Sequence, residues 1–312
     1  MKTRLRLLAA CLAAGALAQA QAQTFPQPRG PREPNAEERE RLEKIVPATA
    51  PAKPAKARRM LVLDINIGHG QHPSIPFAKL ALQLMASHTK AFEPVFDDNP
   101  EMLKAANLKQ FDAIFLNSTI GPIFDTPELK ESFVNFIRNG GGLAGYHAAT
   151  FTNADWMDFS LIIGARNGYH REPTEKVTIK VDDPRSPLTR PFLGKTVQFT
   201  DEFFRFFDEP YTPSRLHILT SIDLARTDMN QGQCGGRSTK PFPPSVRCTK
   251  DDNIYPISWV RSEGKGRIFY TTMGHGYENF FDPLFLEHLL AGIQFALGDL
   301  DTDTTPGNVK PQ

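Results

Sequence analysis

The sequence feature that most constrains the fold is a glycine-rich stretch at residues 140–150, Gly-Gly-Gly-Leu-Ala-Gly-Tyr-His-Ala-Ala-Thr. It follows a segment, 126–139, whose phenylalanines recur at helical spacing, and Gly140 stands where a left-handed helix cap is expected. A short apolar strand, 143–146, must then follow. Because this strand is short and built of small residues, it suits a central position in a sheet covered by helices on both faces.

A histidine, His147, comes directly after this strand. In open α/β sheets, ligands bind in the crevice outside the carboxyl ends of the strands. His147 is therefore the first candidate for a functional residue. The other candidates are those that the chain brings to the same edge of the sheet.

Apolar runs alternate with amphipathic segments from residue 60 to residue 163, which is typical of a parallel sheet with right-handed crossover helices. Strands are predicted at 60–66, 92–97, 112–117 and 143–146, and helices at 75–88, 100–108, 126–139 and 153–163. Strands predominate later, at 175–181, 197–206, 216–222, 255–261 and 267–272, before a last helix at 284–297. The sequence therefore predicts one α/β domain with a parallel sheet, flanking helices and an antiparallel C-terminal extension.

The amino-terminal part of the chain differs in composition from this domain. Residues 1–20 have a basic start, an apolar run and a small-residue cleavage site, as in a secretory signal peptide, so a periplasmic or secreted protein is predicted. Residues 21–58 are rich in Pro, Ala, Gln and charged residues. We expect them to form a flexible leader or linker, with one possible short helix at 36–45.

The domain is expected at 59–298, followed by a disordered tail at 299–312. An insertion at 226–253 contains the two cysteines that remain after signal-peptide removal, Cys234 and Cys248. Export to an oxidising compartment makes them a disulfide candidate, and closing a loop of about 15 residues stabilises a fold by roughly 3 kcal/mol. A reactive or metal-binding thiol pair is the alternative, although the spacing fits no zinc pattern.

The charge balance excludes some classes of partner. The chain has 36 Lys and Arg against 35 Asp and Glu, and Lys2, Arg4 and Arg6 lie in the signal peptide. Such near-neutrality gives no electrostatic case for nucleic acid or an anionic membrane as partner. No later segment reaches the roughly 18 consecutive apolar residues of a membrane span. The sequence predicts no particular oligomeric state.

Three histidines, His69, His147 and His275, each follow a predicted strand, so their imidazoles could converge at one edge of the sheet. The acidic pair Asp201 and Glu202 lies among phenylalanines, where a carboxylate needs a partner. Three imidazoles and Glu202 make a site for a divalent metal, with zinc best suited. Without metal, His and Glu could act as general base and acid on a polyol or carbonyl substrate. Alternatively, each histidine only caps a strand end by hydrogen bonding to backbone.

Within this set, His147, Glu202 and His275 are the predicted catalytic residues. His170 and Asp201 are expected to contact these residues without touching the metal or the substrate. His72 could assist His69, but we expect it to be a solvated loop residue.

The other histidines and the aromatic residues have separate interpretations. His88, His217 and His288 are expected to be structural. The candidates for stacking against a sugar each lie near a Gly or His turn, and are Tyr146, Trp156, Tyr169 and Tyr277. No nucleotide site is predicted, because the glycine run precedes a strand, whereas nucleotide-binding fingerprints follow one.

Six pieces of the sequence carry a family resemblance, at 60–70, 140–149, 156–170, 183–188, 201–202 and 264–275. Together they resemble the ThuA-like (trehalose utilisation) family of the class I glutamine amidotransferase-like superfamily, over about residues 60–298. The resemblance implies a flavodoxin-like core and a link to disaccharide or keto-sugar metabolism. Amidotransferase relatives carry a nucleophilic cysteine where this chain has His147, so Cys-dependent amidotransferase chemistry is excluded.

These observations lead to one functional hypothesis and one alternative. The hypothesis is an exported ThuA-like enzyme, a hydrolase, lyase or isomerase, that processes a glycoside or keto-sugar at a His and Glu site with a possible metal. The alternative is a non-catalytic carbohydrate-binding protein that uses the same cleft.

Overall fold

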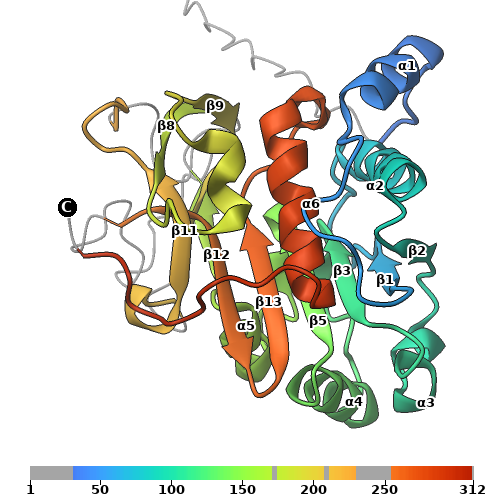
Figure 1. The fold of residues 1–312 in the computed structure, drawn as a ribbon. Coiled ribbons are helices and arrows are strands. Elements are labelled where there is room, and N and C mark those ends of the chain that lie inside the picture. The colour runs from blue at the N-terminus through green and yellow to red at the C-terminus, as the bar shows by residue number, and fades with distance from the viewer. Residues whose placement is uncertain (1–30, 171–173, 207–210, 230–253, 311–312) are drawn as a thin grey trace, which may run out of the picture.

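A nine-stranded sheet organises the molecule, as seen in the computed structural model, which describes residues 31–170, 174–206, 211–229 and 254–310 (Figure 1). Its strand order is β2-β1-β3-β5-β13-β12-β11-β8-β9. The parallel strands are β2 (Glu93–Phe96), β1 (Arg59–Leu63), β3 (Ala113–Asn117), β5 (Gly142–Tyr146) and β13 (Gly266–Thr271). The antiparallel strands are β12 (Pro256–Glu263), β11 (His217–Ile222), β8 (Glu175–Val181) and β9 (Gln198–Asp201). The predicted fold class is confirmed, with β5 in the interior of the sheet between β3 and β13.

Helices cover both faces of the sheet (Figure 1). One face packs against α2 (Ile75–Thr89) and α6 (Pro283–Leu297), with α1 (Ala36–Ile45) packed on α2, and the other against α3 (Ala105–Leu108), α4 (Pro127–Arg138) and α5 (Met157–Ile163). Each face of the sheet has its own hydrophobic core, and one strand contributes to both because its side chains alternate between the faces. Met60 and Val62 lie in one core, and Leu61 and Leu63 in the other. The near-continuous apolar runs of the sequence follow from this double burial.

Shorter elements connect the main ones. They are η1 (Pro100–Leu103), η2 (His147–Thr150), η3 (Pro187–Phe192), η4 (Pro213–Arg215) and η5 (Tyr277–Phe281), and two small strand pairs, β4 (Ile120–Gly121) with β6 (Phe151–Thr152) and β7 (Asn167–His170) with β10 (Phe204–Phe206). The strand predicted at 197–206 is in fact two strands, because β9 pairs with β8 and β10 pairs with β7. Glu202 and Phe203 form the break between them.

The glycine run explains how α6 approaches the central strand. A Cβ atom at Gly142 would overlap the Ala296 carbonyl group of α6, so only glycine allows this close packing. Gly140 has a φ of 115° and ends the α4 segment in the left-handed region, as its position predicts.

The described parts of the leader and the tail pack on the domain, which differs from the flexible leader and disordered tail expected. The short helix expected at 36–45 is confirmed as α1, and it buries Leu42 completely. Arg58 of the leader bonds Asp299 of the tail at 2.6 Å. The amide of Asn308 pairs with the backbone of Ile218 in β11. Apolar burial and specific hydrogen bonds thus offset the conformational entropy that the leader and tail lose on ordering. Composition alone had suggested that this entropy cost would keep them disordered.

Some predictions lie outside the described residues. These are the signal peptide at 1–20, the Cys234 and Cys248 pair, and most of the insertion at 226–253. Within the described part of the chain, none of the helices combines the length and the apolar character needed to cross a membrane.

Candidate metal and acid-base site

His147 lies directly after β5, in a backbone conformation that is rare for a residue other than glycine. Its φ is 47°, and its side chain is fully buried. The Tyr270 hydroxyl donates to the His147 carbonyl oxygen at 2.6 Å, and the imidazole stacks on the ring of Phe204 at 4.5 Å between centroids. Contacts on both sides therefore hold a strained backbone in place, which is common at functional sites.

Three imidazoles converge at the carboxyl edge of the sheet. His72, His147 and His275 each offer a ring nitrogen, and these nitrogens all lie within 4.8 Å of one another. The ring centroid of His147 lies 4.8 Å from that of His72 and 4.9 Å from that of His275. Among the described residues, this group has the geometry to hold a metal ion.

The third member of the group is His72, not His69. The expectation that His72 is a solvated loop residue is wrong, because the loop after β1 folds it inward and leaves it 8% exposed. His69 is exposed, stacks on His72 at 5.7 Å and has its Nδ1 atom 2.7 Å from the Gly70 carbonyl oxygen. Both histidines follow the same strand, so no sequence signal separates them, and only the path of the loop decides which one reaches the site.

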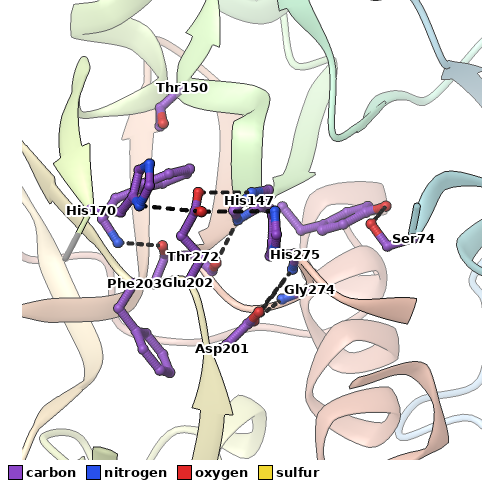
Figure 2. Close-up of polar contacts among 12 residues, drawn as sticks. Ser74, His147, Thr150, His170, Asp201, Glu202, Phe203, Thr272, Gly274 and His275 are labelled. Atoms are coloured by element: carbon purple, nitrogen blue, oxygen red, sulfur yellow. Dashed lines mark hydrogen bonds and ion pairs between the residues drawn. The ribbon is translucent and has the colours of Figure 1, made fainter. Parts of the chain in front are cut away.

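Glu202 lies beside the histidine group, as the sequence predicts (Figure 2). Its carboxyl oxygens are 3.7 Å from His147 Nε2 and 3.8 Å from His275 Nε2. His170 Nδ1 lies 3.2 Å from the same carboxyl group, and the His170 side chain is 40% exposed. Glu202 therefore stands between the buried imidazoles and a histidine that reaches solvent.

Asp201 faces the loop that carries His275. Its carboxylate accepts hydrogen bonds from the backbone N–H groups of Gly274 at 2.5 Å and His275 at 3.1 Å (Figure 2). The predicted supporting position of Asp201 thus corresponds to contact with the backbone of a site histidine.

Burial keeps the imidazoles neutral. It lowers the pKa of His72 to about 3 and that of His275 to about 4, and it holds the pKa of His147 well below its usual range; neighbouring imidazoles lower all three further. His72 Nδ1 and His147 Nε2 have no hydrogen-bond partner in the described part of the chain. Neutral imidazoles with free lone pairs are what a divalent metal requires, so these residues fit such an ion.

Burial has the opposite effect on the acids. It raises the pKa of Glu202 to about 8, with a further contribution from Asp201. It raises the pKa of Asp201 to about 7, although the backbone N–H donors favour the ionised form. In the absence of a cation, Glu202 is therefore mostly protonated at neutral pH and can donate a proton.

The predicted sugar-stacking residues are engaged in packing where their side chains are described. Tyr146 is fully buried and donates to Asn117 Oδ1 at 2.7 Å. Trp156 packs among rings that include Phe133, and Tyr277 stacks on Phe77 at 4.7 Å. The Tyr169 side chain lies outside the described residues. Of these residues, Tyr146 belongs to the core, whereas Trp156 and Tyr277 are half-buried and pack against it.

A groove with a volume of about 550 Å³ is lined in part by Asp201. Its polar lining comes from α1, β9 and η5 and includes Arg41, Gln198, Thr200, Glu278 and Asn279. A second cavity, of about 450 Å³, lies at the opposite edge of the sheet, where Arg58 and Asp112 line it. Of these two, the groove is nearer to the histidine group, because Asp201 and Gly276, which line it, are the chain neighbours of Glu202 and His275.

Comparison with known proteins gives one family and one fold. The sequence model of the ThuA family, described as trehalose utilisation, matches residues 59–296. A ThuA-like protein from Bacteroides uniformis has 21% identity and a TM-score of 0.55, covering 78% of this chain and 94% of that one. One from Parabacteroides merdae has 17% identity and a TM-score of 0.53, covering 82% and 96%. At these identities the likeness extends to the fold alone. Among curated proteins, no match was found.

Proposed function

The chain belongs to the trehalose-utilisation (ThuA) family, and on that premise we propose that it is a metal-dependent enzyme acting on a carbohydrate. The ligands of the divalent ion, with zinc the best suited, are His72, His147 and His275. The substrate class is a glycoside or its keto form, which the family description supports.

The convergence of three neutral imidazole nitrogens within 4.8 Å carries this proposal. Three protein ligands that leave a coordination position open are typical of catalytic zinc, whereas structural zinc is closed by four. Buried nitrogens usually have a hydrogen-bond partner, but His72 Nδ1 and His147 Nε2 have none among the described residues, and the two rings lie 4.8 Å apart.

Glu202 has the position of a general acid and base. Its carboxyl group lies 3.7 Å and 3.8 Å from two of the imidazoles, so it faces any substrate atom held beside them. A bound divalent ion supplies Lewis-acid polarisation of a substrate oxygen. Glu202 then gives a proton to, or takes one from, the substrate, which is the chemistry that a hydrolase, lyase or isomerase of a keto-sugar needs.

The groove beyond Asp201 supports a carbohydrate as the substrate. Its lining carries amide, hydroxyl, carboxyl and guanidinium groups, which pair with sugar hydroxyls, and its volume is within the range of small-molecule sites. We place the part of the substrate that does not react in this groove.

Metal analysis of matched variants tests the proposal. The purified protein is expected to contain one equivalent of divalent metal, which His72→Ala removes and His69→Ala leaves in place. Loss of metal from His69→Ala alone would restore the ligand set that the sequence predicted and overturn the one proposed. Stoichiometric metal and sugar binding without turnover, on a panel of glycosides and keto-sugars, would favour the non-catalytic carbohydrate-binding protein.

Export belongs to the same proposal. The basic and apolar start of the chain and its small-residue cleavage site support it. Mass spectrometry of the protein from a Gram-negative expression host is expected to find a periplasmic form that begins after Ala20. A full-length cytoplasmic form alone would contradict export without affecting the metal site.

A further inference from the structure

The segment after β13, residues 272–276, makes two contributions to the histidine group. His275 belongs to this segment and offers a ring nitrogen to the group. Thr272 accepts a hydrogen bond at its carbonyl oxygen from His147 Nδ1, at 3.3 Å. This bond places the proton on Nδ1 and so turns the lone pair of His147 Nε2 toward the other imidazoles. The path of this short segment therefore determines the position or orientation of two of the three ring nitrogens, those of His275 and His147.

Asp201 holds this segment from a distant part of the sheet. It ends β9, which is separated from β13 by three strands in the sheet order. Its side chain is 2% exposed, and both carboxylate oxygens accept from the backbone: Oδ2 from Gly274 at 2.5 Å, and Oδ1 from His275 at 3.1 Å. The close-up shows the carboxylate directly under the loop (Figure 2).

The loop geometry leaves little freedom once these bonds form. Gly274 has a φ of 111°, and a Cβ atom there would lie 2.6 Å from the Tyr146 ring, so the loop needs glycine at this position, where the Asp201 carboxylate accepts from its N–H group. Two adjacent N–H groups on one carboxylate fix the orientation of the peptide unit between them, and with it the direction in which the His275 side chain leaves the backbone.

We propose that Asp201 is the positioning residue of the metal site, which orients His275 directly and His147 through the Thr272 carbonyl group. The inference rests on the proposed metal-binding function, since it assigns Asp201 a role in holding that site. It also gives the two neighbouring acids different roles: Asp201, the last residue of β9, bonds the backbone of the loop, whereas Glu202, in the break after β9, faces the imidazoles.

The test is the zinc affinity of Asp201→Asn, measured by chelator competition, with Co²⁺ as a spectroscopic probe of ligand geometry. Asparagine keeps the shape but replaces one acceptor oxygen by an N–H donor, which faces another N–H. We expect zinc affinity to fall about 10- to 100-fold, as for other residues that orient metal ligands, and the Co²⁺ absorption spectrum to change.

The matched control is Asp183→Asn. Asp183 is another buried carboxylate, 5% exposed, that accepts from the Arg185 N–H at 3.0 Å and lies 2.9 Å from His217 Nε2. A purely structural role for Asp201 predicts that both variants lose stability and keep zinc affinity, and that result would overturn the proposal. If Asp201→Asn does not fold, Asp201→Glu keeps the carboxylate one methylene further out, and its unchanged zinc affinity would likewise overturn it.

A second readout separates this inference from the proposed function. Amide hydrogen exchange at Gly274 and His275 is expected to be slow in the parent protein and faster in Asp201→Asn, whether or not metal is present. If the parent protein binds neither zinc nor Co²⁺, the metal-dependent function fails, and faster exchange in the variant still supports the positioning role. Unchanged exchange at both amides would overturn the positioning role itself.

Discussion

Two buried histidines in different parts of the molecule, His147 and His288, share their burial and the hydrogen bonding of their ring nitrogens. Both are fully buried, and each has its Nδ1 atom within reach of a backbone carbonyl oxygen, of Thr272 at 3.3 Å and of Leu188 at 2.7 Å. In both, Nε2 has no hydrogen-bond partner in the residues described. Burial lowers both pKa values, that of His288 to about 4.

What differs is the neighbourhood of the free nitrogen. His147 lies near two imidazoles and the Glu202 carboxyl group, whereas His288 packs against the rings of Phe192 and Phe269 at 5.1 Å and 5.3 Å. A buried neutral histidine is therefore not a site by itself. At the carboxyl edge of the sheet several segments bring such residues together, and this grouping makes His147 part of a candidate site.

The largest expected effect comes from making the same change at both positions. Asparagine can keep the hydrogen bond made through Nδ1, removes Nε2, and tolerates the positive φ of His147. We expect His147→Asn to lose bound metal and sugar turnover, with a drop in zinc affinity greater than the about 10- to 100-fold typical of orienting residues. His288→Asn should keep stoichiometric metal, as measured by elemental analysis of the purified proteins.

The proposed difference between His147 and His288 would be wrong if the two variants bound metal equally well. Equal metal content in His147→Asn and His288→Asn would mean that convergence at the sheet edge has no chemical consequence. Both variants remove one buried imidazole, so a similar loss of stability in each serves as the control for folding.

A second prediction concerns Glu202, whose carboxyl group lies near His147 and has no counterpart beside His288. Replacing Glu202 by Gln keeps the size and hydrogen-bonding reach but removes the ability to transfer a proton. We expect turnover to fall about 10²- to 10⁴-fold, the usual contribution of a general acid or base, while metal content stays unchanged. Steady-state kinetics and metal analysis on the same preparation measure both. A loss of metal in Glu202→Gln would instead identify Glu202 as a ligand.

The third prediction uses the property that the two histidines share. An imidazole has a pKa near 6.5 when unfolded, and that of His288 is about 4 when folded, so acid protonates the unfolded state first. The contribution of neutral His288 to stability is fully present above pH 6.5 and is lost progressively as the pH falls to about 4, by at most about 1.4 kcal/mol per pH unit.

Urea unfolding of the metal-free protein between pH 7 and pH 4 measures this dependence. We expect His288→Asn to be less stable than the parent at pH 7 and to lose less stability toward pH 4. Identical slopes for the two proteins would show that His288 is already charged, or already exposed, in the folded state.

Much of the site could be predicted from the sequence because strand ends are visible in it. His147 comes directly after an apolar strand, His275 comes in the turn after another, and Glu202 is an acid among phenylalanines, so local patterns identify all three. His72 could not be separated from His69, because the direction of a loop depends on packing that no local pattern encodes.

The fold shows the same division. Strands and helices were predictable from burial on two faces, but the contact between the end of β9 and the loop after β13 joins residues that are far apart in sequence. That contact gives Asp201 its hydrogen bonds. The packing of the leader and tail on the domain also depends on long-range pairs, such as Arg58 with Asp299, which composition does not reveal.

The smallest expected effect concerns access, since the groove adjoins the site of His147 and not the surroundings of His288. Gln198 lines this groove from an exposed position on β9, so Gln198→Ala should raise KM for the sugar substrate by roughly 5- to 10-fold, the value of one hydrogen bond of about 1 kcal/mol, with kcat little changed. Thr196→Ala, an exposed change on the same segment but outside the lining, is the control. Because uniform binding affects KM and not kcat, an equal fall in kcat for Gln198→Ala would place this side chain at the reacting atoms and extend the site beyond the carboxyl edge of the sheet.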